Sequence, residues 1–263
     1  MFRTLLSLLL FGIPSIIISQ DYPDLGLHGT LTWLDTAHIR VEYDWTNNDQ
    51  LLDWTSTEGS TLVRSDGFVT VTGGTYNYVR SMIWKQGIKC SRISVQDVAA
   101  VTATASDPHI NIYTNLVSFT GSTWLPNPGL GVVMASAKNF WMHDGTNAGN
   151  IGAPMIELGV AHNYEYTSSD TGMTIKSSKD DIVYSYKAQC FLERESKIAL
   201  GGWGGNTRWG KLIIEGEIVK PQQEAPVPSD VINIQSNGAT FAPVIEVVGD
   251  PLIEWIFDDS TTS

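Results

Sequence analysis

The chain has 263 residues, of which 42% are hydrophobic, 10% aromatic and only 17% charged. This composition excludes a disordered chain and a coiled coil, and the length fits one large domain with a small appendage. The formal net charge is −12 and no basic run occurs, so the chain lacks the cationic surface that neutralises phosphates. We therefore expect no nucleic-acid partner.

The N-terminus, residues 1–19, has the pattern of a secretory signal peptide. One positive charge at Arg3 precedes an apolar run that Pro14 interrupts and that ends at the small residue Ser19. A retained membrane anchor is the alternative, but the apolar run is shorter than the ~20 residues that span a bilayer. We expect cleavage near Ser19, a product that is secreted or held at the cell surface, and no membrane span.

Two cysteines occur, Cys90 and Cys190, both in strand-like surroundings. An even count in an oxidising compartment allows a disulfide between them. Two buried free thiols are the alternative, because a chain of this size needs no covalent link. No Cys-x-x-Cys or Cys/His ligand spacing is present, so a structural zinc site is not expected.

Short segments in which apolar and polar residues alternate recur along the chain, rich in β-branched and aromatic residues. Six of them span residues 38–45, 67–72, 78–84, 109–113, 181–187 and 211–219. No window sustains a helical apolar stripe, and the best candidate, 94–105, is dominated by alternating Val, Ala and Thr. The pattern predicts an all-β protein whose antiparallel strands form two packed sheets, because so many strands cannot stay in one open sheet.

A change in composition divides the chain near residue 220. Residues 220–229 hold three prolines and read as a linker, which separates a main sandwich over 20–219 from strand-like runs in 230–263. Thirty-odd residues bury little by themselves, so they dock on the sandwich or begin a second β module. The acidic end, 253–263, resembles the tip of PKD-like bacterial surface modules.

The segment 197–219 pairs a strand ending in glycines with an aromatic-Gly-x-Ile strand. It resembles the closing hairpin of concanavalin A-like lectin/glucanase domains of the laminin-G type, and the resemblance covers residues 27–219. It implies an antiparallel jelly roll, a fold that hosts lectins, hydrolases, lyases and adhesins. Sandwiches of this type often hold calcium through Asp and Asn, which implies two candidate donor pairs: Asp144 with Asn147, and Asp180 with Asp181.

Catalytic signatures are sparse. The Glu-x-Asp-x-x-Glu strand of the jelly-roll glucanases is missing, and the nearest acidic pairs are 193/195 and 215/217, each on one strand face. For the second pair a solvated strand face, with the neighbouring apolar residues turned to the core, is the favoured interpretation. No Gly-x-Ser-x-Gly turn occurs, and the five histidines are scattered.

Three loops combine indoles with polar side chains, as sugar sites do when flat rings stack on CH faces and amides, carboxylates or guanidinium groups bind hydroxyls. They supply the predicted ligand-binding residues Trp203, Asn206, Arg208, Trp209, Trp124, Trp141, Asp144 and Asn147. Trp203 stands between glycines, so its indole is either docked back on the sheet or offered to a ligand. The tryptophans at 33, 45, 54 and 84 lie in alternating strands and are expected in the core.

These observations predict a secreted, lectin-like β-sandwich that binds a glycan or another surface polymer, with calcium as the one cofactor considered. An extracellular glycoside hydrolase or polysaccharide lyase on the same scaffold is one alternative. A structural or adhesive surface protein is the other. The sequence leaves open the saccharide, the oligomeric state and any catalytic activity.

Overall fold

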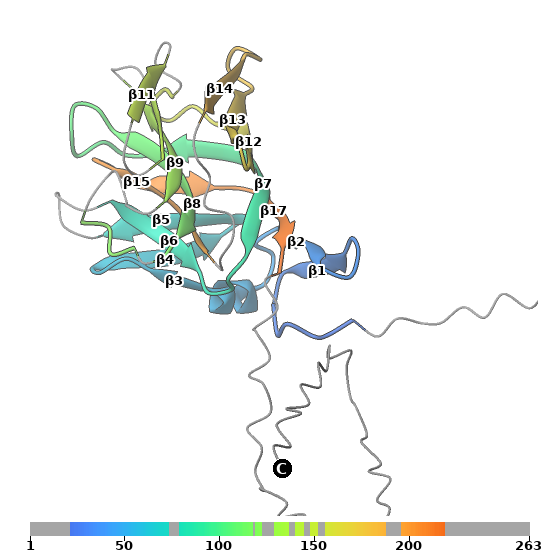
Figure 1. Cartoon of the computed structure of the whole chain (residues 1–263). Helices are drawn as coiled ribbons and strands as arrows, with labels where there is room; N and C mark the ends of the chain where they lie inside the picture. Colours follow the sequence, from blue (N-terminus) through green and yellow to red (C-terminus); the bar gives the residue numbers. More distant parts are fainter. Residues whose placement is uncertain are drawn as a thin grey trace, which may run out of the picture. The chain divides into compact units, whose positions relative to one another are not determined.

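The computed structural model describes residues 22–73, 79–117, 119–122, 129–136, 140–144, 148–151, 156–187 and 196–218. These residues form seventeen strands and one short 3-10 helix. The strands make two antiparallel sheets that pack face to face (Figure 1). This confirms the predicted all-β, two-sheet sandwich of the jelly-roll class.

The larger sheet has ten strands, of which seven follow the order β1-β2-β17-β7-β12-β13-β14, while β16 joins β7 to β5 and β4. Its members are β1 (Thr30–Trp33), β2 (His38–Tyr43), β4 (Ser60–Ser65), β5 (Phe68–Gly73), β7 (Lys89–Ala100), β12 (His162–Ser169), β13 (Gly172–Ser177), β14 (Val183–Lys187), β16 (Thr207–Trp209) and β17 (Leu212–Glu217). The window 94–105, the best helical candidate in the sequence, therefore begins inside the longest strand of this sheet.

The second sheet has seven strands in the order β11-β10-β9-β8-β15-β6-β3. They are β3 (Trp54–Ser56), β6 (Arg80–Trp84), β8 (His109–Leu116), β9 (Leu130–Ala135), β10 (Phe140–His143), β11 (Ala148–Ile151) and β15 (Lys197–Trp203). The helix η1 (Asn48–Asp53) leads directly into β3. Because β15 pairs with β8 on one side and β6 on the other, residues far apart in the sequence meet at the centre of this sheet.

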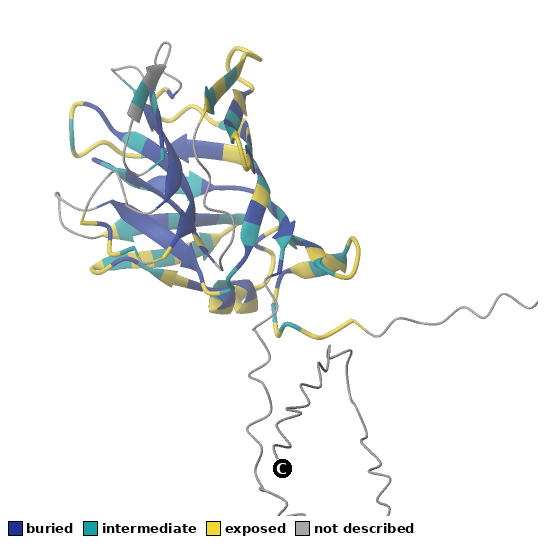
Figure 2. Ribbon diagram, in the orientation of Figure 1, coloured by how far each residue is buried: buried dark blue, intermediate teal, exposed yellow. Residues whose placement is uncertain are grey.

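Period-two alternation explains how each strand of the larger sheet is oriented. In β2, Ile39, Val41 and Tyr43 are fully buried, while the residues between them are half-buried and polar. The core that results includes Trp45, Trp84 and Trp209, all fully buried. The central strands of the seven-stranded sheet are buried along almost their whole length, whereas β1 and β14 alternate with exposed residues (Figure 2).

Several predicted segments lie outside the described residues: the leader, the linker and the C-terminal β module with its PKD-like tip. The boundaries predicted for them stay predictions. Within the described residues, no helix is long and apolar enough to cross a membrane.

Candidate functional site

The exposed face of the ten-stranded sheet is a ladder of ion pairs, which we call the ionic ladder. Arg92 contacts Glu215 at 3.0 Å and Glu165 at 3.1 Å, Lys89 contacts Glu217 at 3.5 Å, and Arg40 reaches Glu42 at 2.7 Å. The pair 215/217 therefore lies on a solvated strand face, with its carboxylates engaged by cations. The pair 193/195 lies outside the described residues.

The opposite outer surface of the sandwich is different. We call outer face the side of the seven-stranded sheet that is turned away from the ten-stranded sheet. It carries an apolar cluster of its own, formed by Val79, Ile83, Tyr113, Leu116, Val133 and Ala199. Trp141 and Trp203 pack against this cluster and remain half-buried.

Three rings lie in sequence across the outer face, from β15 over β8 to β10; we call them the aromatic row. The Trp203 ring centroid is 5.1 Å from that of His109, which is 5.9 Å from that of Trp141. Strand pairing explains the first contact, since Trp203 and His109 are direct partners across β15 and β8. Half-buried indoles on a sheet face are the feature that stacks on the CH face of a sugar.

A buried carboxylate supports the middle of the aromatic row. Asp107 Oδ2 lies 3.5 Å from His109 Nε2, and Ser136 Oγ donates to Asp107 Oδ1 at 3.3 Å. The His109 side chain is 13% exposed and that of Asp107 is 8% exposed. The carboxylate therefore orients the imidazole between the two indoles.

A second polar position follows His109 on the same face of β8. Asn111 is fully buried, and among the residues that the structure describes neither its amide oxygen nor its amide nitrogen has a hydrogen-bond partner. Ser81, which flanks Gly201 in the same row of the sheet, is also fully buried and its hydroxyl is likewise unpaired within that part of the chain. Such groups are rare in folded proteins and call for a reason.

The third row of the outer face holds a pair of buried rings. Tyr113 and His143 lie with ring centroids 5.7 Å apart over Gly131, where an added Cβ would collide with both. Burial lowers the pKa of His143 to about 4 and raises the pKa of Tyr113 above its ordinary value. Both rings are thus neutral near pH 7.

The residues predicted to bind a ligand separate into different places. Trp203 ends β15 on the outer face, and Trp141 lies in β10 beside it, so two of the eight meet. Asp144 follows β10 and is half-buried. Trp124 and Asn147 lie outside the described residues.

The prediction for Trp209 was wrong. Its indole is fully buried in the core between the sheets, where Nε1 donates to Thr207 Oγ1 at 3.2 Å, so it offers no surface to a ligand. The alternation of β16 turns Thr207 and Trp209 inward and Arg208 outward.

Asn206 and Arg208 are engaged within the fold rather than gathered around Trp203. Asn206 Oδ1 accepts a hydrogen bond from Arg80 at 3.2 Å, and the Arg208 guanidinium lies 4.5 Å from the Phe68 ring centroid. The glycines after Trp203 also have a packing role, because a side chain at 204 or 205 would collide with the segment 102–105.

His109 and Asn111 were not predicted as site residues. Their strand was recognised from its alternation, which places 109, 111 and 113 on one face. The signal that could have found them is a run of polar or aromatic residues on the second face of a strand whose first face is apolar. What the pattern could not supply is the pairing of β8 with β15.

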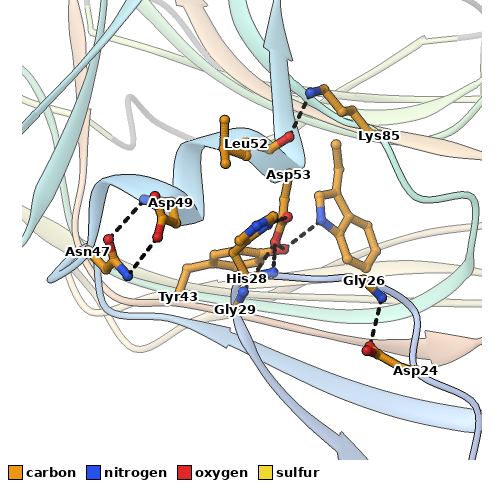
Figure 3. A network of polar contacts seen from close by, with 11 residues as sticks. Asp24, Gly26, His28, Gly29, Tyr43, Asn47, Asp49, Leu52, Asp53 and Lys85 are labelled. Atoms are coloured by element: carbon orange, nitrogen blue, oxygen red, sulfur yellow. Dashed lines mark hydrogen bonds and ion pairs between the residues drawn. The ribbon is translucent and has the colours of Figure 1, made fainter.

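A buried carboxylate network lies elsewhere, beneath η1 (Figure 3). Asp53 accepts hydrogen bonds from the backbone N–H groups of His28 and Gly29, from His28 Nδ1 at 2.7 Å and from Tyr43 Oη at 2.8 Å. Trp84 Nε1 donates in turn to Tyr43 Oη at 2.7 Å. This Asp53 cluster anchors the segment before β1 to the core and is saturated with internal partners.

The calcium donors at 180 and 181 have partners within the fold, while Asn147 of the other donor pair lies outside the described residues. Asp180 accepts from Ile182 N and Tyr184 Oη, Asp181 pairs with Lys176, and the described residues hold no group of three or more side chains that could bind a metal. Cys90 is fully buried. Cys190 lies outside the described residues, so the disulfide stays a prediction.

No protein-family model and no curated protein sequence matches the chain. Several solved structures match its fold. A Bacillus subtilis protein of unknown function with a galectin-like fold shares 9% identity over 68% of this chain and 96% of its own, with a TM-score of 0.52.

Two further matches are a Bacillus licheniformis β-glucanase and the Bacillus subtilis carbohydrate-binding module CBM66. The first has 9% identity, covers 66% of this chain and 97% of its own, and gives a TM-score of 0.48. The second has 11% identity, covers 60% and 94%, and gives a TM-score of 0.43. At these identities the likeness concerns the fold alone, a jelly-roll sandwich; the concanavalin A-like and laminin-G resemblances stay expectations.

Proposed function

We propose that the chain is a secreted or surface-bound glycan-binding protein and that the aromatic row on the outer face is its binding site. The observation that carries this proposal is the placement of half-buried Trp203 and Trp141 on either side of His109, at centroid spacings of 5.1 and 5.9 Å. The half-buried indoles of Trp203 and Trp141 are the rings on which sugar units would stack, with the His109 ring between them. Asp107 and Asn111 add polar groups beside it.

The alternatives receive less support from the described residues. A retaining or inverting hydrolase needs two carboxyl groups facing each other across roughly 5–10 Å. Asp107, the carboxylate in contact with the aromatic row, is instead paired with His109 and bonded to Ser136. An adhesive protein would need a flat exposed apolar patch, whereas the ten-stranded sheet presents the ionic ladder.

The test compares tryptophans in and out of the row. Binding of the full chain to a glycan array, followed by calorimetry on the best ligand, is measured for wild type, Trp203→Ala and Trp141→Ala. Trp33→Ala is the matched control, because Trp33 is also half-buried but stacks on Tyr22 at the β1 edge of the other sheet.

We expect each row variant to bind about tenfold more weakly or worse, since a stacked ring contributes on the order of 1.5 kcal/mol or more, and the control to bind as wild type. Equal binding by Trp203→Ala and Trp33→Ala would contradict the proposal. Shortened glycan products after incubation with wild type would favour the hydrolase or lyase alternative instead.

A further inference from the structure

Among the buried amide side chains of the described residues, Asn111 has both polar atoms unpaired, whereas Gln50 and Asn115 each leave only one atom without a partner. Buried amides in native proteins have hydrogen-bond partners, because an unpaired polar group away from water destabilises the folded state. Asn111 is fully buried in the middle of a central strand, and both of its amide atoms lack partners within the described residues. A Leu or Val would fit the same strand position at no such cost, so the amide needs an explanation outside folding.

The position of Asn111 connects it to the aromatic row. It follows His109 by two residues in β8, so both side chains are on the outer face. Across the sheet Asn111 is level with Val133 of β9, which is level with Trp141 of β10. Asn111 therefore lies next to His109 on the outer face and in the same cross-strand register as Trp141.

A second unpaired group lies on the other side of Asn111. Gly201 is the direct neighbour of Asn111 in β15, and Ser81 is the next residue along that row. A Cβ at position 201 would collide with Ser81 Oγ and the Arg80 carbonyl oxygen, so only glycine leaves the serine hydroxyl in this place. The amide and the hydroxyl together form a short polar strip on the outer face.

We propose that Asn111 is a specificity-determining residue of the glycan site and that the site takes an uncharged saccharide. This inference rests on the proposed function. An unpaired amide offers two N–H donors and an acceptor oxygen, so its complement is a group that both donates and accepts, such as a hydroxyl or an acetamido group. A uronate carboxylate only accepts, which would leave Asn111 Oδ1 unpaired.

The charges around the strip also favour an uncharged ligand. Asp107 lies beside His109 at the row, and the chain carries a net charge of −12. An anionic glycan would meet repulsion both locally and at long range. Asn111 is fully covered in this structure, so the saccharide group reaches it when a neighbouring side chain changes rotamer, as is common on binding.

The experiment separates a recognition role from a packing role by measuring stability and binding together. Asn111→Leu is nearly isosteric and removes the unpaired amide; Asn111→Val is the second variant should the first fail to fold. Thr114→Val is the matched control. Thr114 is also fully buried in β8, but it faces the core between the sheets and its hydroxyl bonds Tyr166 Oη at 2.9 Å.

Thermal unfolding and calorimetry are run on the full chain, with glucose oligomers, N-acetylglucosamine oligomers and galacturonate oligomers as probes. We expect the Asn111 variant to melt about 2–4 °C higher or more and to bind the neutral or acetamido probe at least tenfold more weakly. We expect Thr114→Val to melt lower and bind as wild type.

The outcomes are distinguishable. If wild type binds none of the three probes and nothing on the array, the proposed function fails and this inference fails with it. If wild type binds but the Asn111 variant binds equally well, the inference alone is overturned. Preferred binding of galacturonate oligomers would overturn the assignment of an uncharged ligand, and the two remaining probes identify which neutral group is recognised.

Discussion

The Asp53 cluster and the polar strip at Asn111 are both buried, yet they are built in opposite ways. Asp53 engages both carboxylate oxygens with four donors, and Tyr43 is itself bonded by Trp84. Asn111 and Ser81 have unpaired groups within the described residues. The first arrangement serves the fold, because three of the four contacts connect the segment at His28 and Gly29 to the core and the fourth connects Tyr43 of β2.

The difference gives a practical way to separate structural from functional polar groups in this protein. A satisfied buried group stabilises the chain through the partners that it holds, so removing it is expensive. An unsatisfied one lowers stability, and where both polar atoms of a side chain are unpaired, as at Asn111, we infer a task that is not folding. The changes below bear on this comparison, from the largest expected effect to the smallest.

Asp53→Ala is expected to lower the free energy of unfolding by roughly 3–5 kcal/mol, because three N–H donors and the Tyr43 hydroxyl lose their acceptor in a buried place. Urea unfolding followed by tryptophan fluorescence measures this. Glycan binding by the folded fraction should be unchanged, since the aromatic row lies on the outer face, whereas Tyr43 and Trp84 of the cluster belong to the core between the sheets. A loss below about 1 kcal/mol would show that the cluster does not anchor the fold.

His143 makes the outer face sensitive to acid. Its pKa is about 4 in the folded chain, against 6.5 for an ordinary histidine, because burial disfavours the charged ring. The unfolded chain therefore binds the proton more tightly, and up to about 3 kcal/mol of stability present above pH 6.5 is lost as the pH falls to 4. Unfolding free energies of wild type and His143→Gln at several pH values should differ in slope within this window, and parallel curves would count against the assignment.

Tyr43→Phe removes one donor from Asp53 and the acceptor of Trp84 Nε1 while keeping the ring in the core. The expected loss is about 2 kcal/mol, smaller than for Asp53→Ala because Asp53 keeps its other donors. The same urea titration measures it. Equal losses in the two variants would mean that the tyrosine hydroxyl, not the carboxylate, holds the cluster together.

Ser81→Ala should have the smallest effect. Because the hydroxyl is buried and unpaired in the described residues, its removal is expected to leave stability unchanged or raise it by less than about 1 kcal/mol. Differential scanning calorimetry resolves a change of this size as a small upward shift in Tm. A clear fall in Tm would show that Ser81 has a structural partner and that only Asn111 belongs to the strip.

Much of the fold could be predicted from the sequence because each strand reports its own orientation. The segments expected at 38–45, 67–72 and 109–113 overlap β2, β5 and β8, and the absence of a helical stripe at 94–105 correctly indicated a strand. Alternation is a local property, so it survives without knowledge of the partners.

The candidate site was only partly predictable, because it depends on pairings between distant strands. Trp203 and Trp209 lie six residues apart in the same glycine-rich segment and looked alike in sequence. The structure places one on the outer face and the other in the core, since they belong to strands of different sheets. In the sequence His109 is one of five scattered histidines. The pairing of β15 with β8 is what places Trp203 beside it.

The ionic ladder also bears on how copies of this chain behave when crowded together. Two such ladders pressed against each other would have to shed the water around every carboxylate and cation, a cost that their mutual attraction does not recover without ideal geometry. The ten-stranded sheet is therefore poorly suited to self-association or to non-specific sticking, and added salt weakens its ion pairs without exposing apolar surface. The exposed surface of the ten-stranded sheet therefore stays hydrated, and a partner would dock on the outer face of the seven-stranded sheet.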